Sequence, residues 1–167
     1  MSAIKLVVAV SHGDVMGMKG KLPWPSFSKD MQHFRELTQG HVVIMGRKTW
    51  ESLPEAVRPL PGRVNMVLTR KADFQAEGAE IYYDIPTAIQ EAEHRYPDKD
   101  IFVIGGAELY KQTSHLADTL IITNIDKTYE GDTFFPITLK YWELYRQEDV
   151  VDKGVILSFR WYQRYLD

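Results

Sequence analysis

One carboxylate, Asp30, has neighbours that could make it an acid catalyst. It falls in the first turn of a predicted helix over 28–38, and the i, i+4 spacing places Phe34 on the same helix face. A carboxylate that faces an apolar pocket loses hydration, so its pKa rises and it becomes a candidate acid. The alternative is a surface residue that complements the helix dipole, which would lower the pKa. The spacing alone leaves both interpretations open.

Two loops carry cations directly after predicted strands. Gly46-Arg47-Lys48-Thr49 leads from a strand into a helix, and Thr69-Arg70 closes another strand. Free backbone N–H groups together with guanidinium and ammonium groups would bind a phosphate. The alternative is a set of solvated cations in turns, although the net charge of −3 makes two such loops informative.

A pair of glycines, Gly105-Gly106, follows a buried strand and precedes a predicted helix over 108–113. The missing side chains would let the backbone approach a pyrophosphate closely. The pair is not the complete Gly-x-Gly-x-x-Gly fingerprint, so by itself it is a weak signal.

The segment 16–24 combines hinges with an apolar end. Gly17 and Gly20 provide mobility, while Leu22, Pro23 and Trp24 form a stiff apolar stretch, as a lid over a site would need. The alternative is an ordinary surface loop pinned by one buried Trp. Taken together, the four segments indicate a small domain that binds a phosphorylated dinucleotide beside an apolar slot with one carboxylate. They do not identify the substrate.

The elements that must position these residues alternate between strand and helix. Apolar, branched runs predict strands, helical periodicity predicts helices, and Ser28 is expected to cap the helix over 28–38. We expect an α/β fold with one mostly parallel central sheet of about eight strands, flanked by about four helices. Asp152-Lys153-Gly154 predicts an antiparallel C-terminal hairpin. The expected strands are 4–10, 41–45, 64–69, 80–83, 100–104, 119–125, 142–151 and 155–165. The expected helices are 28–38, 48–53, 85–96 and 108–113, and the main loops are 11–25 and 54–62.

Composition excludes several classes of function. The 167 residues fit one domain, 1–167. The chain contains no cysteine, and its five histidines lack the spacing of metal ligands, so no metal is expected. The net charge of −3 argues against nucleic acid. No apolar run has the length of a membrane span or a signal peptide. The lack of cysteine suits a reducing cytoplasm, where we expect the protein to be located. Nothing indicates a second domain, and we expect a monomer.

Five collinear motifs resemble the dihydrofolate reductase family, from Ile4 to the final hairpin. They are Gly17-x4-Leu22-Pro23-Trp24 with Asp30-Met31 and Phe34, Val43 to Ser52, Arg58 to Arg63, Ile104 to Tyr110, and Glu130 to Pro136. The resemblance implies NADPH-dependent reduction of 7,8-dihydrofolate to 5,6,7,8-tetrahydrofolate in one-carbon metabolism, with antifolate inhibitors binding the folate site. The acid is Asp, as in bacterial members, where animal members have Glu. The stretches 25–29 and 54–57 are longer than in the shortest members.

Site residues carry over from the resemblance position by position. The reacting centre would contain Asp30, Thr123, Leu22 and Trp24. The substrate would contact Val7, Val8, Asp30, Met31, Phe34, Leu53, Arg63, Ile104 and Thr123, with Arg63 on the glutamate tail. The cofactor would contact Ala9, Met16, Gly17, Gly46, Arg47, Lys48, Thr49, Leu68, Thr69, Arg70, Ile104, Gly105, Gly106, Ala107, Glu108, Leu109 and Tyr110.

Two alternatives remain beside this interpretation. A reductase for another pterin or a flavin precursor would have no need to combine Asp30 with Arg63. A dinucleotide-binding module without catalysis would keep Arg47 and Gly105-Gly106, but it would need neither an acid at position 30 nor a lid.

Overall fold

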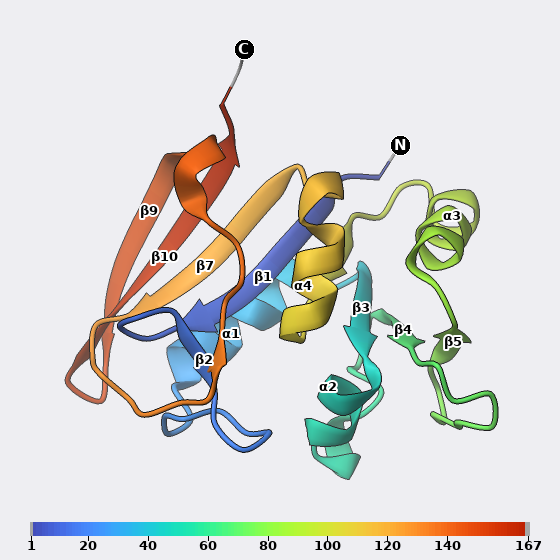
Figure 1. Ribbon diagram of the computed structural model, residues 1–167, viewed down its shortest axis with the longest axis horizontal. Coiled ribbons are helices and arrows are strands. Elements are labelled where there is room, and N and C mark those ends of the chain that lie inside the picture. Colours follow the sequence, from blue (N-terminus) through green and yellow to red (C-terminus); the bar gives the residue numbers. More distant parts are fainter. Residues whose placement is uncertain (1, 166–167) are drawn as a thin grey trace.

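The computed structural model describes residues 2–165, and its centre is one eight-stranded sheet with the order β5-β4-β3-β6-β1-β7-β10-β9 (Figure 1). The strands are β1 (Ile4–Val10), β2 (Val15–Gly17), β3 (Val42–Gly46), β4 (Val64–Leu68), β5 (Glu80–Tyr82), β6 (Ile101–Val103), β7 (Thr119–Ile125), β8 (Thr133–Phe134), β9 (Trp142–Asp152) and β10 (Val155–Arg164). The α-helices are α1 (Ser28–Thr38), α2 (Arg47–Ser52), α3 (Ile85–Arg95) and α4 (Ala107–Thr113), and short 3₁₀ turns are η1 (Glu55–Val57), η2 (Ser114–Leu116) and η3 (Leu139–Tyr141).

The six strands from β5 to β7 are parallel, and β10 and β9 complete the sheet in antiparallel orientation. The inner parallel strands are apolar because both of their faces are covered. The expected fold class is therefore confirmed, including the C-terminal hairpin and the four α-helices.

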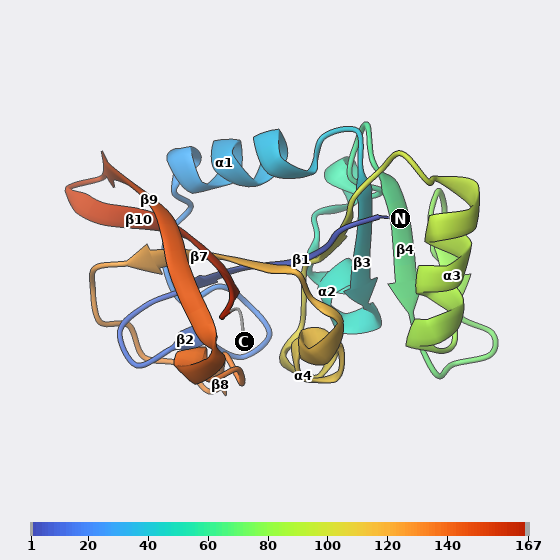
Figure 2. The same ribbon diagram turned by 90° about the horizontal axis from the view of Figure 1, so that it is seen from above.

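Two cores lie on opposite faces of this sheet. Along β1, Leu6 and Val8 pack into the core under α3 and α4, whereas Val7 packs into the core under α1 and α2. Figure 2 shows α1 on one side of the sheet and α4 on the other. The alternation of side chains along a strand thus supplies both layers.

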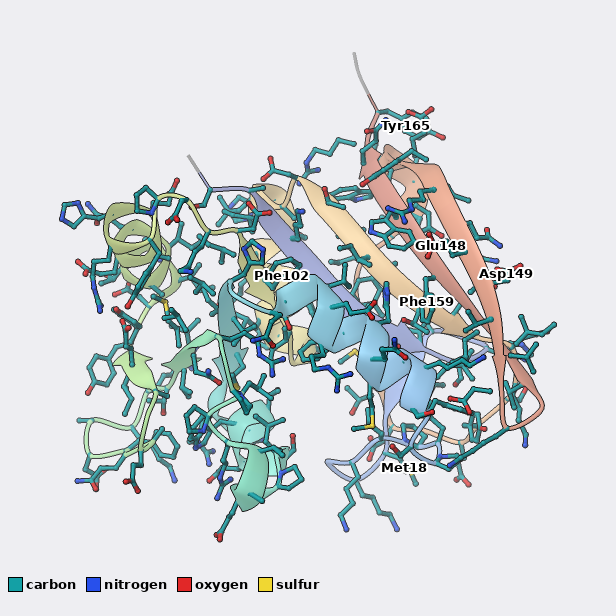
Figure 3. All side chains as sticks on the ribbon, turned by 180° about the vertical axis from the view of Figure 1, so that it is seen from behind. Met18, Phe102, Glu148, Asp149, Phe159 and Tyr165 are labelled. Carbon is teal, nitrogen blue, oxygen red and sulfur yellow. The ribbon has the colours of Figure 1, made fainter. Side chains whose placement is uncertain are left out.

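Helix α1 is fixed to the sheet by an aromatic contact with β10. The ring of His33 stacks on Phe159 with centroids 3.9 Å apart and planes 16° apart. Figure 3 shows α1 crossing this face of the sheet, with Phe159 beside it and Met18 in the loop near the helix. This contact, together with the hydrogen bonds of Ser28 and Lys29 to Asp152, holds α1 against the sheet.

Two local predictions were wrong. Ser28 does not cap α1; the N-cap is Phe27, and the Ser28 hydroxyl instead donates to Asp152 Oδ2 at 3.4 Å. Ser28 is already the first helical residue, so its side chain is past the capping position. The segment 11–25 is not only a loop, because it contains β2, which pairs with the equally short β8. Strands of two or three residues leave no alternation for a sequence pattern to detect.

None of the helices within residues 2–165 is long and apolar enough to cross a membrane.

Candidate active site

The carboxylate of Asp30 is held by a residue that is distant in the sequence. Thr123, on β7, donates a hydrogen bond from its hydroxyl to Asp30 Oδ1 at 2.8 Å. Burial raises the pKa of Asp30, and the Thr123 hydrogen bond partly offsets that rise. This direction rejects the surface interpretation, under which the helix dipole would lower the pKa.

An apolar wall lies beside this carboxylate. Phe34 and Leu37 of α1 and Leu53 after α2 are half-buried and pack against the core under α1 and α2. Met31 differs from them, because its side chain is 59% exposed and its sulfur accepts a hydrogen bond from Ser26 Oγ at 2.8 Å. Of the residues expected to line the substrate slot, Phe34 and Leu53 therefore lie against this core, and Met31 does not.

Arg63, directly before β4, lies beside the C-terminal end of α1. Its guanidinium donates to Pro61 O at 2.9 Å and to Thr38 Oγ1 at 3.1 Å, and it stands 6.0 Å from the centre of the Phe34 ring. Burial and the nearby charge of Arg35 lower its pKa. Within residues 2–165 it forms no ion pair with a carboxylate, so a substrate carboxylate could take that place.

The strands β1 and β6 stop pairing before the carboxyl end of β1. Their pairing ends at Leu6 and Val103. Beyond that point the Val7 carbonyl accepts a hydrogen bond from the buried Tyr110 hydroxyl at 2.6 Å, and burial raises the pKa of Tyr110. Ile104 follows Val103 directly, so Val7 and Ile104, two of the expected substrate contacts, both lie where this pairing ends. In parallel sheets, ligands bind beyond the carboxyl ends of the strands.

Glycines form a narrow cradle at this edge of the sheet. The Gly46 N–H donates to Gly105 O at 2.9 Å, which brings the starts of α2 and α4 together. A Cβ on Gly105 would lie 3.4 Å from Tyr110 Oη and 3.5 Å from Thr49 Oγ1. The N-cap residues Gly46 and Gly106 supply no side-chain cap. Hydroxyl groups and backbone N–H groups around a space without side chains fit the pyrophosphate of a dinucleotide.

The predicted cations flank this cradle. Gly46 and Leu68 are register partners on β3 and β4, so the loops that follow these strands are neighbours. Arg47 is engaged with Glu51 at 2.6 Å, and Lys48 and Arg70 are exposed. The Thr69 hydroxyl accepts from the Lys71 N–H at 3.0 Å. The two cationic loops predicted separately therefore form one surface.

The predicted lid is attached to a second, distant segment. Asp132 accepts a hydrogen bond from the Lys19 N–H at 3.0 Å through its side chain, and its own N–H donates to Gly17 O at 3.0 Å. The Trp24 ring is buried and meets Tyr129 edge-on at 5.9 Å, whereas Leu22 is 64% exposed. Sequence reasoning assigned no role to Asp132 or Tyr129, although Asp132 lies within the quoted motif 130–136.

The remaining predicted contacts could act mainly through the backbone. Val8 and Leu109 have side chains buried in the core under α3 and α4, and Met16 packs against that core. Ala9 is half-buried on the opposite side, and Glu108 is exposed and accepts from Gln112 Nε2 at 2.8 Å. Among residues 2–165, no three His, Asp or Glu side chains form a group that could hold a metal.

Comparisons with known proteins agree on one family. The family model for dihydrofolate reductase matches residues 3–164. A dihydrofolate reductase of Neisseria meningitidis serogroup A is 40% identical over 99% of this chain and 100% of its own, and one of Mycobacterium leprae is 40% identical over 85% and 86%. A dihydrofolate reductase from Enterococcus faecalis, solved with NADP(H) and RAB-propyl, superposes with a TM-score of 0.85 at 33% identity, covering 97% of this chain and 96% of its own.

Proposed function

The chain belongs to the dihydrofolate reductase family, and we propose that Asp30, its partner Thr123 and the surrounding loops carry out the family's reaction. That reaction is the NADPH-dependent reduction of 7,8-dihydrofolate to 5,6,7,8-tetrahydrofolate. One observation supports the assignment most strongly: a half-buried carboxylate of raised pKa is oriented by a hydroxyl and lies one helical turn before Phe34, which packs against the core.

When bound, NADPH would supply the hydride for pterin C6, and the protein would have to provide a route for a proton to pterin N5. Asp30 accepts hydrogen bonds from the amino-pyrimidine edge of the pterin and promotes protonation of N5 through a water molecule. Thr123 holds the Asp30 carboxylate in place. Phe34 and Leu53 keep water from the slot, and the carbonyls of Val7 and Ile104 receive the pterin amino group.

One set of charged groups would bind dihydrofolate, and another would bind NADPH. The planar guanidinium of Arg63 suits the α-carboxylate of the glutamate tail. Gly105, Gly106 and Thr49 would hold the pyrophosphate. The 2′-phosphate, which distinguishes NADPH from NADH, would be held by Arg47, Lys48, Thr69 and Arg70. Antifolate inhibitors bind the folate site. The whole chain, 1–167, acts as one domain, as a monomer and in the cytoplasm.

The test is direct. Purified protein is mixed with NADPH and dihydrofolate, and absorbance at the reduced nicotinamide band is followed, with each ligand omitted in turn. We expect oxidation only when both are present, with production of tetrahydrofolate verified by chromatography. The assignment would be refuted if the protein binds NADPH but reduces no dihydrofolate at every pH tested between 5 and 8.

A further inference from the structure

His33 is a titratable side chain of α1 to which the proposed reaction gives no role. Its ring stacks on Phe159, with centroids 3.9 Å apart, and meets the Trp161 ring edge-on at 5.5 Å. Its Nε2 atom is buried and finds no hydrogen-bond partner among residues 2–165. A buried polar atom without a partner destabilises a fold, because it has lost its hydrogen bonds to water. A phenyl ring would fill the same space without that cost, so packing alone does not explain a histidine here.

The stack lies next to the hydrogen bond that holds the candidate acid. Phe159 of β10 and Thr123 of β7 are register partners, so their side chains are neighbours on the sheet face that α1 crosses (Figure 3). Asp30 and His33 are three residues apart in α1, which places them on one side of the helix. Within one turn, α1 therefore makes two contacts with neighbouring positions of the sheet, the carboxylate hydrogen bond and the aromatic stack. A shift of the helix at one contact must displace the other.

The surroundings of the ring favour its uncharged form. Burial lowers the pKa of His33, and the nearby charge of Arg146 adds to this shift. The charges of Glu148 and Glu36 oppose it, but burial is the largest influence. Glu148 is already paired with Arg146 at 2.5 Å. The charged and titratable side chains that line the hollow around the ring are Lys5 of β1, Glu36 of α1, and Tyr145, Arg146 and Glu148 of β9.

We propose that His33 is a positioning residue for Asp30, an inference that rests on the proposed role of that carboxylate. The neutral imidazole seats α1 on the sheet and so keeps the carboxylate of Asp30 within reach of Thr123. Protonation of the ring favours its return to water, which loosens this turn of the helix and hydrates the carboxylate. The pKa of Asp30, which burial raises, then moves back toward its ordinary value.

This coupling acts on the acidic side of neutrality. A histidine whose pKa is lowered in the folded protein takes up its proton first in the unfolded or loosened state. The contribution of the neutral ring is therefore complete above the ordinary histidine pKa and is lost as the pH falls below it. A phenyl ring at position 33 would keep α1 seated at every pH.

The experiment compares kcat/KM between pH 5 and 8 in the wild type, His33→Phe, His33→Ala and His94→Ala. His94 is a matched control, because it is an exposed histidine in the last turn of α3, a helix on the other face of the sheet. His33→Ala removes the stack and should lower kcat/KM about fivefold at pH 8, the scale of one aromatic pair. His33→Phe should restore the wild-type value at pH 8 and exceed it at pH 5, because its ring cannot be protonated. His94→Ala should follow the wild type throughout.

Carbon-13 NMR of the Asp30 carboxyl group gives a readout that is independent of turnover. We expect this carboxyl to titrate at a lower pH in His33→Ala than in the wild type, because the loosened helix exposes it to water. His33→Phe should retain the wild-type titration. Melting temperatures of the variants separate this local effect from a general loss of stability.

Two outcomes would overturn the inference. If His33→Phe follows the wild-type pH profile from pH 5 to 8, protonation of the ring has no effect on the seating of α1. If the Asp30 carboxyl titrates alike in His33→Ala and the wild type, the stack does not position it, whatever the melting temperatures show. A wild-type protein that reduces no dihydrofolate would refute the proposed function instead, while the carboxyl titration would still decide whether His33 positions Asp30.

Discussion

The hydroxyl of Thr123 and the carboxylate of Asp30 are joined by a 2.8 Å hydrogen bond across 93 positions of sequence. Thr123 is 3% exposed and belongs to an inner strand, so its hydroxyl cannot swing into solvent for another partner. The bond orients the carboxylate and favours its ionised form, while burial opposes ionisation. The pKa of Asp30 is thereby subject to two opposing influences, of which burial is the larger.

Asp30→Asn should retain NADPH binding but lose dihydrofolate reduction by about a hundredfold near neutral pH, the scale of a lost acid–base group. The amide is isosteric and can still accept the Thr123 hydrogen bond, so the structure should survive. Acidification should partly restore turnover, because solvent then protonates the pterin. Steady-state rates between pH 5 and 8 provide the measurement, and unchanged turnover at pH 7 would remove Asp30 from the reacting centre.

The same substitution should stabilise the protein at neutral pH. The pKa of Asp30 is higher in the folded protein than in the unfolded chain. At pH values above the folded-state pKa, the desolvated carboxylate is charged and lowers the free energy of unfolding. This destabilisation disappears as the pH falls below the unfolded-state pKa, where both states are protonated. Urea unfolding of both proteins should give Asp30→Asn the higher free energy of unfolding at pH 7. The difference should shrink toward acidic pH; a constant difference would contradict the linkage.

Thr123→Val should shift the pH dependence of the reaction. Without the hydroxyl, the influence that lowers the pKa of Asp30 is lost, so that pKa rises further. The alkaline fall of kcat/KM should move to higher pH, and kcat/KM near neutrality should fall about tenfold for the lost bond to a charged group. Thr123→Ser keeps the hydroxyl and serves as the control. A lower rate with an unchanged pH profile would indicate a structural role only.

Replacement of both Arg47 and Arg70 by Ala should distinguish the two nicotinamide cofactors. Loss of two charge-assisted contacts should weaken NADPH by about a hundredfold, while NADH should change little. Binding titrations supply both constants, with Lys140→Ala as a control for the general loss of positive charge. An equal loss for NADPH and NADH would place the 2′-phosphate elsewhere.

Gly131→Ala should disturb the attachment of the lid. A Cβ there would stand 2.2 Å from Val15 Cγ1 and 2.7 Å from Gly17 O, so the pairing of β2 with β8 must shift. We expect a free energy of unfolding lower by about 1–3 kcal/mol and slower hydride transfer in stopped-flow experiments. The double variant with Val15→Ala should recover part of the stability, because only the backbone contact remains. Wild-type rates in Gly131→Ala would show that this attachment does not affect the lid.

Much of the architecture could be predicted from short windows of sequence. The apolar run 4–10 coincides with β1, and the periodicity over 28–38 coincides with α1. Local propensity and burial on both faces leave few alternatives for such segments. The short strands β2 and β8 were missed, because their pairing joins two segments that contain no periodic signal of their own.

The sequence by itself determined which groups are available: one carboxylate near an apolar helix face, two cationic loops, a glycine pair and a lid-like segment. Only the tertiary structure decided what each group experiences. The pKa of Asp30 rises because packing of α1 against the sheet desolvates the carboxylate, and the hydrogen bond from Thr123 partly offsets that rise. Desolvation and hydrogen bonding depend on neighbours that sheet register brings together from distant positions, and no local window contains that information.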